Sequence, residues 1–369
     1  GFLLNVDFEQ QLPAPTAASC LSRWSYFVLK NFLHPCMSVT ILNLFQLSYL
    51  YSALNSILSL RRPWRKSGEC RSQIKSRTGK THWDQRRVKR GLPCQQTAAG
   101  CERFDSENLR DPFQVSCYAM DIFEYLKNRE ERYKCKDYMR NQTSINADMR
   151  AVLVDWMVEV QETFELNHET LYLAVKMVDL YLGQVSIKKT LLQLVGATAM
   201  FIACKYDNTP SIEDFHYICA EEYKITDILA MEINMIKTLN FDLGAPLSYR
   251  FLRRYSRCAK VQMPLLTLAR YILELSLMQY SCIMFSESKL GAAALFLALQ
   301  MKKISGWTPT LAFYSGYELK DFAHIVLFLN KMLREKPKSN ISTIRNKYSH
   351  KVFFEVAKTE LLRDEDLQL

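Results

Sequence analysis

The stretch from Met149 to Leu182, MRAVLVDWMVEVQETFELNHETLYLAVKMVDLYL, carries the clearest structural pattern in the 369-residue chain. Its apolar residues recur every three or four positions, which is the spacing of one face of an α-helix. Asn167 interrupts the pattern and is a residue type that caps helix starts. The stretch therefore predicts two consecutive helices, over 147–165 and 168–183.

The helical spacing continues on both sides of this stretch. From residue 111 onward, no convincing alternation of apolar and polar residues indicates a strand. Leu243-Gly244-Ala245-Pro246 breaks the run of helices near its middle. We therefore predict an all-α fold with a leading amino-terminal helix, two sets of five helices and a short final helix within 348–358. Besides the two helices above, the predicted ranges are 113–131, 187–206, 211–220, 225–239, 247–259, 264–280, 286–302, 309–315 and 318–334.

An internal repeat divides the helical part into two halves. LYLA at 171–174 returns as LTLA at 266–269, and GATA at 196–199 returns as GAAA at 291–294, both 95 positions later. The pattern Tyr223…Asp227…Leu239 returns 94 positions later as Tyr317…Asp321…Leu333. The repeat predicts two homologous domains, 111–245 and 246–369. Small residues allow close helix approach, so the GATA and GAAA helices are predicted at the two bundle centres.

The surplus of positive charge is local. The chain has 48 Lys and Arg against 38 Asp and Glu, and the segment 61–90, with twelve basic and two acidic residues, accounts for the whole net charge of +10. Residues 1–110 are predicted to be a disordered or non-native amino-terminal region with a basic linker at 61–90. Arg86-Arg87-Val88-Lys89-Arg90 is typical of a nuclear-import patch, which predicts a nuclear protein, with the cytoplasm as a second compartment.

Motifs of catalysis and metal binding are missing. The eleven glycines form no GxG, and the sequence contains no GxSxG, HExxH, HRD or DFG. The eleven cysteines form no CxxC pair, which argues against a zinc site or a disulfide framework and favours a reducing compartment. We therefore expect a binding protein rather than an enzyme, with no metal and no cofactor.

One candidate binding surface lies on the first quoted helix. An apolar stripe runs beside an acidic edge, an arrangement that fits a peptide with an arginine followed by an apolar residue. From the residues alone, a helix buried in the core is the favoured alternative. The stripe comprises Met149, Leu153 and Trp156, and the edge comprises Asp155, Glu159 and Glu162.

A second candidate is the pair Lys205 and Glu232. Glu232 lies between Leu229 and Ile236 on the apolar stripe of its helix, and Lys205 ends an earlier apolar helix. A carboxylate on a core stripe needs a cationic partner, so the two residues are expected to pair. The open alternative is that both side chains are solvated separately.

Four runs of the sequence resemble the cyclins, and among them the B-type mitotic cyclins. They are the stretch quoted above, LQLVGATAMFIACKY at 192–206, AMEINMIKTLNFDL at 230–243 and YRFLRRYSRCAK at 249–260. HETLYLAVK at 168–176 and YRFLRR at 249–254 are most similar to the divergent third member of the vertebrate B group. The resemblance covers roughly 111–358 and implies two tandem five-helix cyclin-box domains.

The resemblance also implies a function. It predicts a regulatory subunit, itself not an enzyme, that binds and activates a cyclin-dependent Ser/Thr kinase at the G2/M transition and in mitosis or meiosis, and that helps to recruit substrates. The implied kinase-binding residues are Lys205, Glu232, Phe241, Tyr118, Ile122 and Tyr125. The implied docking patch for Arg-x-Leu motifs of substrates or inhibitors comprises Met149, Leu153, Asp155, Trp156, Glu159, Leu192 and Gln193.

The chain departs from the family pattern after Lys205. The family usually continues with Phe-Glu-Glu and a longer loop, whereas here the segment 206–210 leads quickly into Ser211, which bears on kinase affinity or choice. The family's RxxL destruction box is also missing before residue 150, and RAVL at 150–153 lies inside a predicted helix.

Two other functions are weighed against a kinase regulator. A nucleic-acid-binding transcription factor with the same fold would need basic residues on the fold itself, and Arg250, Arg253, Arg254 and Arg257 form a small cluster. Because the fold is neutral as a whole, we expect no nucleic-acid partner. The uncharged segment 31–60 has the outline of a membrane span, but polar residues interrupt it and no membrane attachment is expected.

Overall fold

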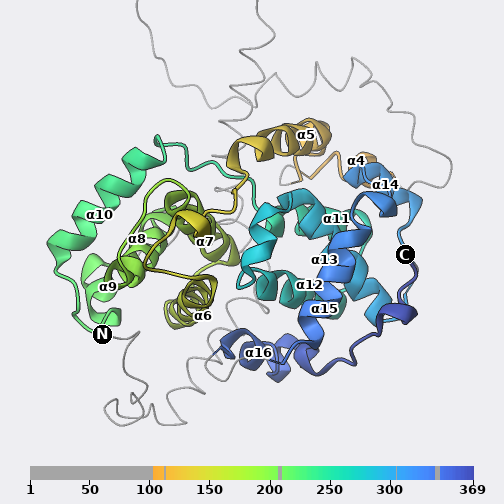
Figure 1. Ribbon diagram of the computed structural model, residues 1–369. Helices are drawn as coiled ribbons and strands as arrows, with labels where there is room; N and C mark the ends of the chain where they lie inside the picture. The colour runs from red at the N-terminus through yellow and green to blue at the C-terminus, as the bar shows by residue number, and fades with distance from the viewer. Residues whose placement is uncertain (1–102, 112–113, 207–209, 305, 337–340) are drawn as a thin grey trace, which may run out of the picture.

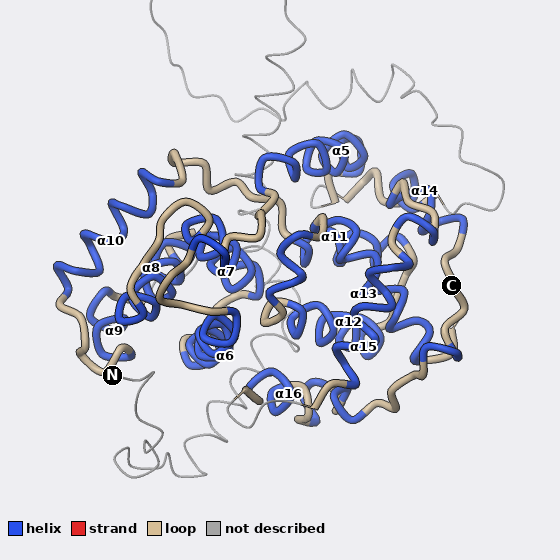
Figure 2. Tube along the Cα trace, in the orientation of Figure 1, coloured by secondary structure: helices blue, strands red, loops and turns tan. Residues whose placement is uncertain are grey.

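The computed structural model describes residues 103–111, 114–206, 210–304, 306–336 and 341–369. Throughout these ranges the regular elements are helices and no strand occurs (Figures 1 and 2), which confirms the predicted all-α class. The predictions for residues 1–102, including the basic linker and the uncharged segment, lie outside the described residues. None of the described helices is both long enough and apolar enough to cross a membrane.

Two groups of five helices lie side by side (Figure 1). The first group begins where the Asn146 side chain accepts a hydrogen bond from the amide of Met149, and its fourth helix begins at a capping box formed by Ser211 and Asp214. Its members are α6 (Ala147–Thr163), α7 (His168–Leu182), α8 (Leu192–Cys204), α9 (Ile212–Ile218) and α10 (Ile225–Thr238).

The second group follows the Gly244-Ala245-Pro246 break. It comprises α11 (Ser248–Cys258), α12 (Met263–Ser276), α13 (Glu287–Met301), α14 (Pro309–Ser315) and α15 (Ala323–Arg334). Three further helices flank the two groups: α4 (Phe104–Glu107) and α5 (Ala119–Glu130) before them, and α16 (Thr343–Lys347) after them. Figure 1 shows α5 above α11, while α16 lies below, near α6 and α12.

The GATA and GAAA helices lie at the centres of the two groups, as predicted. Every residue of α8 is buried, and so is nearly all of α13. At Gly196, a Cβ atom would come within 2.6 Å of Leu153 Cδ1, and at Gly291 it would lie 3.0 Å from the Ser248 carbonyl oxygen. Glycine at these two positions therefore allows α6 to pack closely on α8, and α11 on α13.

Helix boundaries differ from the predictions mainly where short 3₁₀ turns precede α-helices, at 116–118, 189–191 and 319–321. The predicted final helix within 348–358 is wrong. That segment forms two 3₁₀ turns, Lys351–Phe353 and Val356–Lys358, because Phe354 and Glu355 between them have left-handed φ values of 56° and 51°. The terminal α-helix lies earlier in the chain, as α16.

A hydrogen bond of the buried Arg150 side chain and an ion pair of the buried Lys176 side chain join the two groups. Arg150 on α6 makes a bidentate pair with Asp179 on α7, with N–O distances of 2.6 and 2.7 Å, and also donates to the Leu277 carbonyl at the end of α12. Lys176 on α7 reaches Glu287 at the start of α13 at 2.9 Å. The RxxL sequence at 150–153 is therefore inside the core, since Arg150 is only 1% exposed.

Candidate functional site

Lys205 and Glu232 are brought together at the surface of the first group. Lys205 caps the carboxyl end of α8, and its Nζ forms an ion pair with Glu232 Oε1 on α10. The same Nζ lies 4.4 Å from the centre of the Phe201 ring. The lysine side chain is 45% exposed and the glutamate 11%. The predicted pairing is therefore present, with the lysine open to a partner.

Exposed apolar side chains lie on α10 and just after it, near Glu232 in the sequence. The inner face of α10 buries Ile228 and Met235, while Leu229 and Ile233 remain 41% and 56% exposed. Phe241, just after the helix, is 72% exposed. Exposed aliphatic and aromatic groups beside a partly buried ion pair are typical of a surface that binds another protein. We call Lys205, Leu229, Glu232, Ile233 and Phe241 the α10 surface.

The other predicted kinase-binding residues lie on and just before α5. Tyr118, Ile122 and Tyr125 are all partly buried, and the last two pack against the main core. The chain leaving α10 runs toward α5 (Figure 1), and Arg129 joins the two segments. Its guanidinium donates to the Tyr125 hydroxyl at 3.2 Å and to the Gly244 carbonyl at 3.0 Å, and it pairs with Asp242. Arg129 was not among the site residues predicted from the sequence.

The predicted docking patch is largely part of the core. Leu153, Trp156, Leu192 and Gln193 are between 0% and 7% exposed. Leu153 packs on Gly196 of α8. Met149 is partly exposed and Glu159 is exposed, and Val152, which the prediction left out, is partly exposed between them on the same helix. The accessible part of this surface is therefore a narrow strip along α6.

The acidic edge of α6 already has a partner within the chain. Thr343, the first residue of α16, donates from its amide to Asp155 Oδ1 at 3.1 Å and from its hydroxyl to Asp155 Oδ2 at 2.8 Å. The same hydroxyl lies 3.2 Å from Glu159 Oε1. Burial raises the pKa of Asp155, although these hydrogen bonds from Thr343 oppose the rise. Asp155 therefore holds α16 in place, and Glu159 is the accessible carboxylate of the two.

Glu162 lies on the same acidic edge of α6, and its carboxyl group has a raised pKa. Burial raises its pKa to about 7, with Lys347 opposing the rise and Glu274 and Glu159 adding to it. Because the unfolded chain releases this proton near its ordinary pKa of 4.5, the folded state binds more protons between about pH 4.5 and pH 7. The contribution of Glu162 to stability therefore falls as pH rises through this window and levels off above it.

The Glu162→Gln variant tests this titration. We expect its denaturation midpoint to fall less between pH 5 and pH 8 than that of the wild-type chain, and to exceed the wild-type midpoint at pH 8. Urea denaturation at both pH values measures the difference. Glu360→Gln, at an exposed position, is the matched control. An unchanged pH dependence in Glu162→Gln would contradict the raised pKa.

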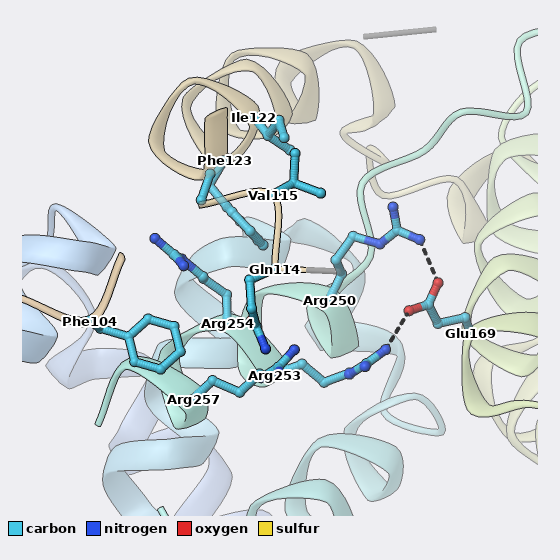
Figure 3. A pocket seen from close by; sticks show the side chains of 11 residues that line it. Phe104, Gln114, Val115, Ile122, Phe123, Glu169, Arg250, Arg253, Arg254 and Arg257 are labelled. Carbon is cyan, nitrogen blue, oxygen red and sulfur yellow. Dashed lines mark hydrogen bonds and ion pairs between the residues drawn. The ribbon is translucent and has the colours of Figure 1, made fainter. Parts of the chain in front are cut away.

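The arginine cluster lines a small pocket of about 70 Å³ between α11, α5 and the segment before α5 (Figure 3). Glu169 on α7 reaches Arg250 at 2.5 Å and Arg253 at 3.3 Å, as the dashed lines show. Arg254 is buried and makes a bidentate pair with Asp105 of α4, at 2.7 and 2.6 Å. Three arginines of the predicted basic cluster are thus paired with carboxylates inside the protein.

The described ranges hold no group of three or more His, Cys, Asp or Glu side chains placed to bind a metal ion. Burial raises the pKa of the thiols of Cys135, Cys219 and Cys282 to about 12, so these three cysteines are thiols rather than reactive thiolates.

Comparisons with known families agree with this architecture. The first group matches the cyclin amino-terminal domain over residues 121–244, and the second matches the cyclin carboxy-terminal domain over 246–362. The X-ray structure of a viral cyclin from herpesvirus saimiri has a similar fold, with a TM-score of 0.52 and 22% identity, covering 58% of this chain and 97% of that one. The chain belongs to the cyclin family.

Several B-type cyclins are similar to this chain. G2/mitotic-specific cyclin-B3 of Drosophila melanogaster is 60% identical over 274 residues, which is 72% of this chain and 48% of the fly protein. The Caenorhabditis elegans cyclin-B3 is 42% identical over 269 residues, 71% of this chain and 70% of the worm protein. The predicted resemblance to the third B-type cyclin is confirmed. The chain spans 48% of the fly relative and 64% of the Gallus gallus relative.

Proposed function

We propose that this chain is a non-catalytic regulatory subunit that binds and activates a cyclin-dependent Ser/Thr kinase in the nucleus, at the G2/M transition and in mitosis or meiosis. The observation that carries the proposal is the α10 surface. It combines the Lys205–Glu232 pair with the exposed side chains of Leu229, Ile233 and Phe241. Its similarity to G2/mitotic-specific cyclin-B3 proteins supports the cell-cycle assignment.

The chemistry of the α10 surface suits docking to a kinase backbone. A lysine ammonium donates hydrogen bonds and a glutamate carboxylate accepts them, so the pair can bind carbonyl and amide groups of a partner segment simultaneously. The apolar side chains on either side would exclude water from these bonds and strengthen them. Binding of this kind can move a helix of the partner's active site into its active position.

Removing the ion pair tests the proposal. We expect Lys205→Ala with Glu232→Ala to weaken binding to a purified cyclin-dependent kinase by at least about tenfold, or ~1.4 kcal/mol, with a matching loss of histone phosphorylation. Isothermal titration and a kinase assay measure the two effects. Lys358→Ala with Glu355→Ala removes an exposed ion pair elsewhere and is the matched control. Normal binding and activation by the Lys205/Glu232 double variant would contradict the proposal.

The same proposal includes substrate recruitment, which we assign to the accessible strip of α6. Met149 and Val152 supply apolar contacts, and Glu159 supplies a carboxylate that can pair with the arginine of an Arg-x-Leu motif. The buried Leu153, Trp156 and Leu192 would support this strip from below.

Met149→Ala with Glu159→Ala tests recruitment without disturbing the core. We expect roughly a tenfold fall in kcat/KM for substrates with an Arg-x-Leu motif, and little change for short peptides that lack it. Kinase assays on both substrate classes give the comparison. Met263→Ala with Glu360→Ala changes an exposed methionine and an exposed glutamate elsewhere and serves as control. Equal losses on both substrate classes would contradict recruitment by this strip.

A further inference from the structure

Arg129 makes an unusual set of contacts for a side chain near the end of a helix. Besides the bonds to Tyr125 and Gly244 and the pair with Asp242, it donates to the Tyr133 hydroxyl at 2.8 Å. Its carbon Cζ lies 5.4 Å from the Tyr133 ring centre and 5.9 Å from that of Tyr125. The side chain is 19% exposed. One guanidinium thus joins α5 to the segment that follows α10.

The segment that Arg129 holds has a strained backbone. Asn240 and Phe241 have left-handed φ values of 52° and 57°, a conformation that a bulky aromatic residue rarely adopts. Their amides bond to the carbonyl oxygens of Lys237 and Ile236, at 3.0 Å in both cases. This geometry ends α10 and leaves the Phe241 ring 72% exposed. The Arg129 contacts with Asp242 and Gly244 lie directly after this turn and hold the chain that leaves it.

Gly244 leaves room for the guanidinium. A Cβ atom at this position would lie 3.1 Å from the Arg129 terminal nitrogen, so a larger residue would push the guanidinium away. Lysine could not replace the arginine, because a single ammonium cannot reach the four partners that the planar fork reaches. The contacts therefore depend on both residues, which lie more than a hundred positions apart in the sequence.

We propose that Arg129 is a positioning residue for the kinase-binding surface. It fixes Phe241 at a defined place relative to Tyr125, so that the α10 surface and the α5 residues meet the partner as one preformed surface. This inference rests on the proposed function. It assigns to Arg129 an indirect role, exerted through Phe241, rather than a contact with the kinase.

A double-mutant cycle on the full chain tests the indirect role. We expect Arg129→Ala to weaken kinase binding about tenfold, and Gly244→Val, which displaces the guanidinium without removing it, to act in the same direction. In a Phe241→Ala background, Arg129→Ala should cost less than about twofold, because the residue it positions is gone. Arg334→Ala, which breaks an exposed pair with Asp364, is the control and should bind normally.

Hydrogen exchange on the free chain supplies a measurement that needs no kinase. We expect Arg129→Ala to speed exchange of the Asn240 and Phe241 amides while the α13 amides keep their protection. Unchanged exchange at these amides, or additive losses in the cycle, would overturn the inference even if the wild-type chain binds the kinase. Failure of the wild-type chain to bind any cyclin-dependent kinase would instead contradict the proposed function, and with it the role of Phe241.

Discussion

The Arg150→Met variant should lose about 3–5 kcal/mol of unfolding free energy, because it leaves the Asp179 carboxylate buried without its cation. The two side chains are 1% and 5% exposed, and the bidentate pair is completed by the Tyr138 hydroxyl, which donates to Asp179 at 2.7 Å. The substitution also removes the bond to Leu277 that ties α6 to the second domain. Urea denaturation at neutral pH measures the loss.

Two further variants separate the pair from simple packing. Arg150→Met with Asp179→Leu removes both charges, and we expect it to regain much of the lost stability, since a buried ion pair offsets its own desolvation only in part. Arg334→Ala, at an exposed pair, should change stability by less than about 1 kcal/mol. If the double variant is no more stable than Arg150→Met alone, the loss comes from packing rather than from the unpaired carboxylate.

The second large effect is expected at Glu274, which joins three parts of the chain. On α12, Glu274 accepts from Lys347 Nζ at 2.6 Å and from the Tyr348 hydroxyl at 2.8 Å, while Lys347 also donates to Gln161 of α6 at 2.8 Å. Burial alone would raise the pKa of Glu274, but Lys347 holds it well below the usual range, so the carboxylate is ionised. Glu274 and Lys347 are 1% and 2% exposed.

Glu274→Gln should therefore destabilise the protein by about 3 kcal/mol, by leaving the Lys347 ammonium buried without its counter-charge. We also expect faster hydrogen exchange across α16, because that helix is held by Lys347 and by the bonds from Thr343 to Asp155. Glu274→Gln with Lys347→Met is the matched control and should recover stability. Unchanged exchange at α16 in the single variant would show that Thr343 and Asp155 hold the helix without help.

Local sequence patterns predicted the architecture well. The GATA and GAAA runs identified α8 and α13 as the central helices because small residues are needed wherever helix backbones come close. The Lys205–Glu232 pair was also predictable, since a carboxylate on an apolar stripe requires a cation. In both cases the information lies in residue type and helical spacing.

Contacts between distant segments were not predictable in the same way. Nothing in the residues around Asp155 shows that Thr343, 188 positions later, will occupy its carboxylate. For Leu153 and Trp156 the residues alone favoured a buried helix, whereas the resemblance implied a docking patch. Because α6 is apolar on nearly all sides, its pattern does not distinguish a core face from a binding face. Arg129 was missed because its partners Asp242 and Gly244 lie on another segment.

The position of α16 has a consequence for synthesis of the protein. Asp155 and Gln161 belong to the first domain, yet their hydrogen-bond partners Thr343 and Lys347 follow them in the chain by 188 and 186 positions. Domains usually fold in order as the chain emerges. We therefore expect the polar groups of α6 to stay hydrated, and the first cyclin box to stay incompletely packed, until the segment that forms α16 has been synthesised.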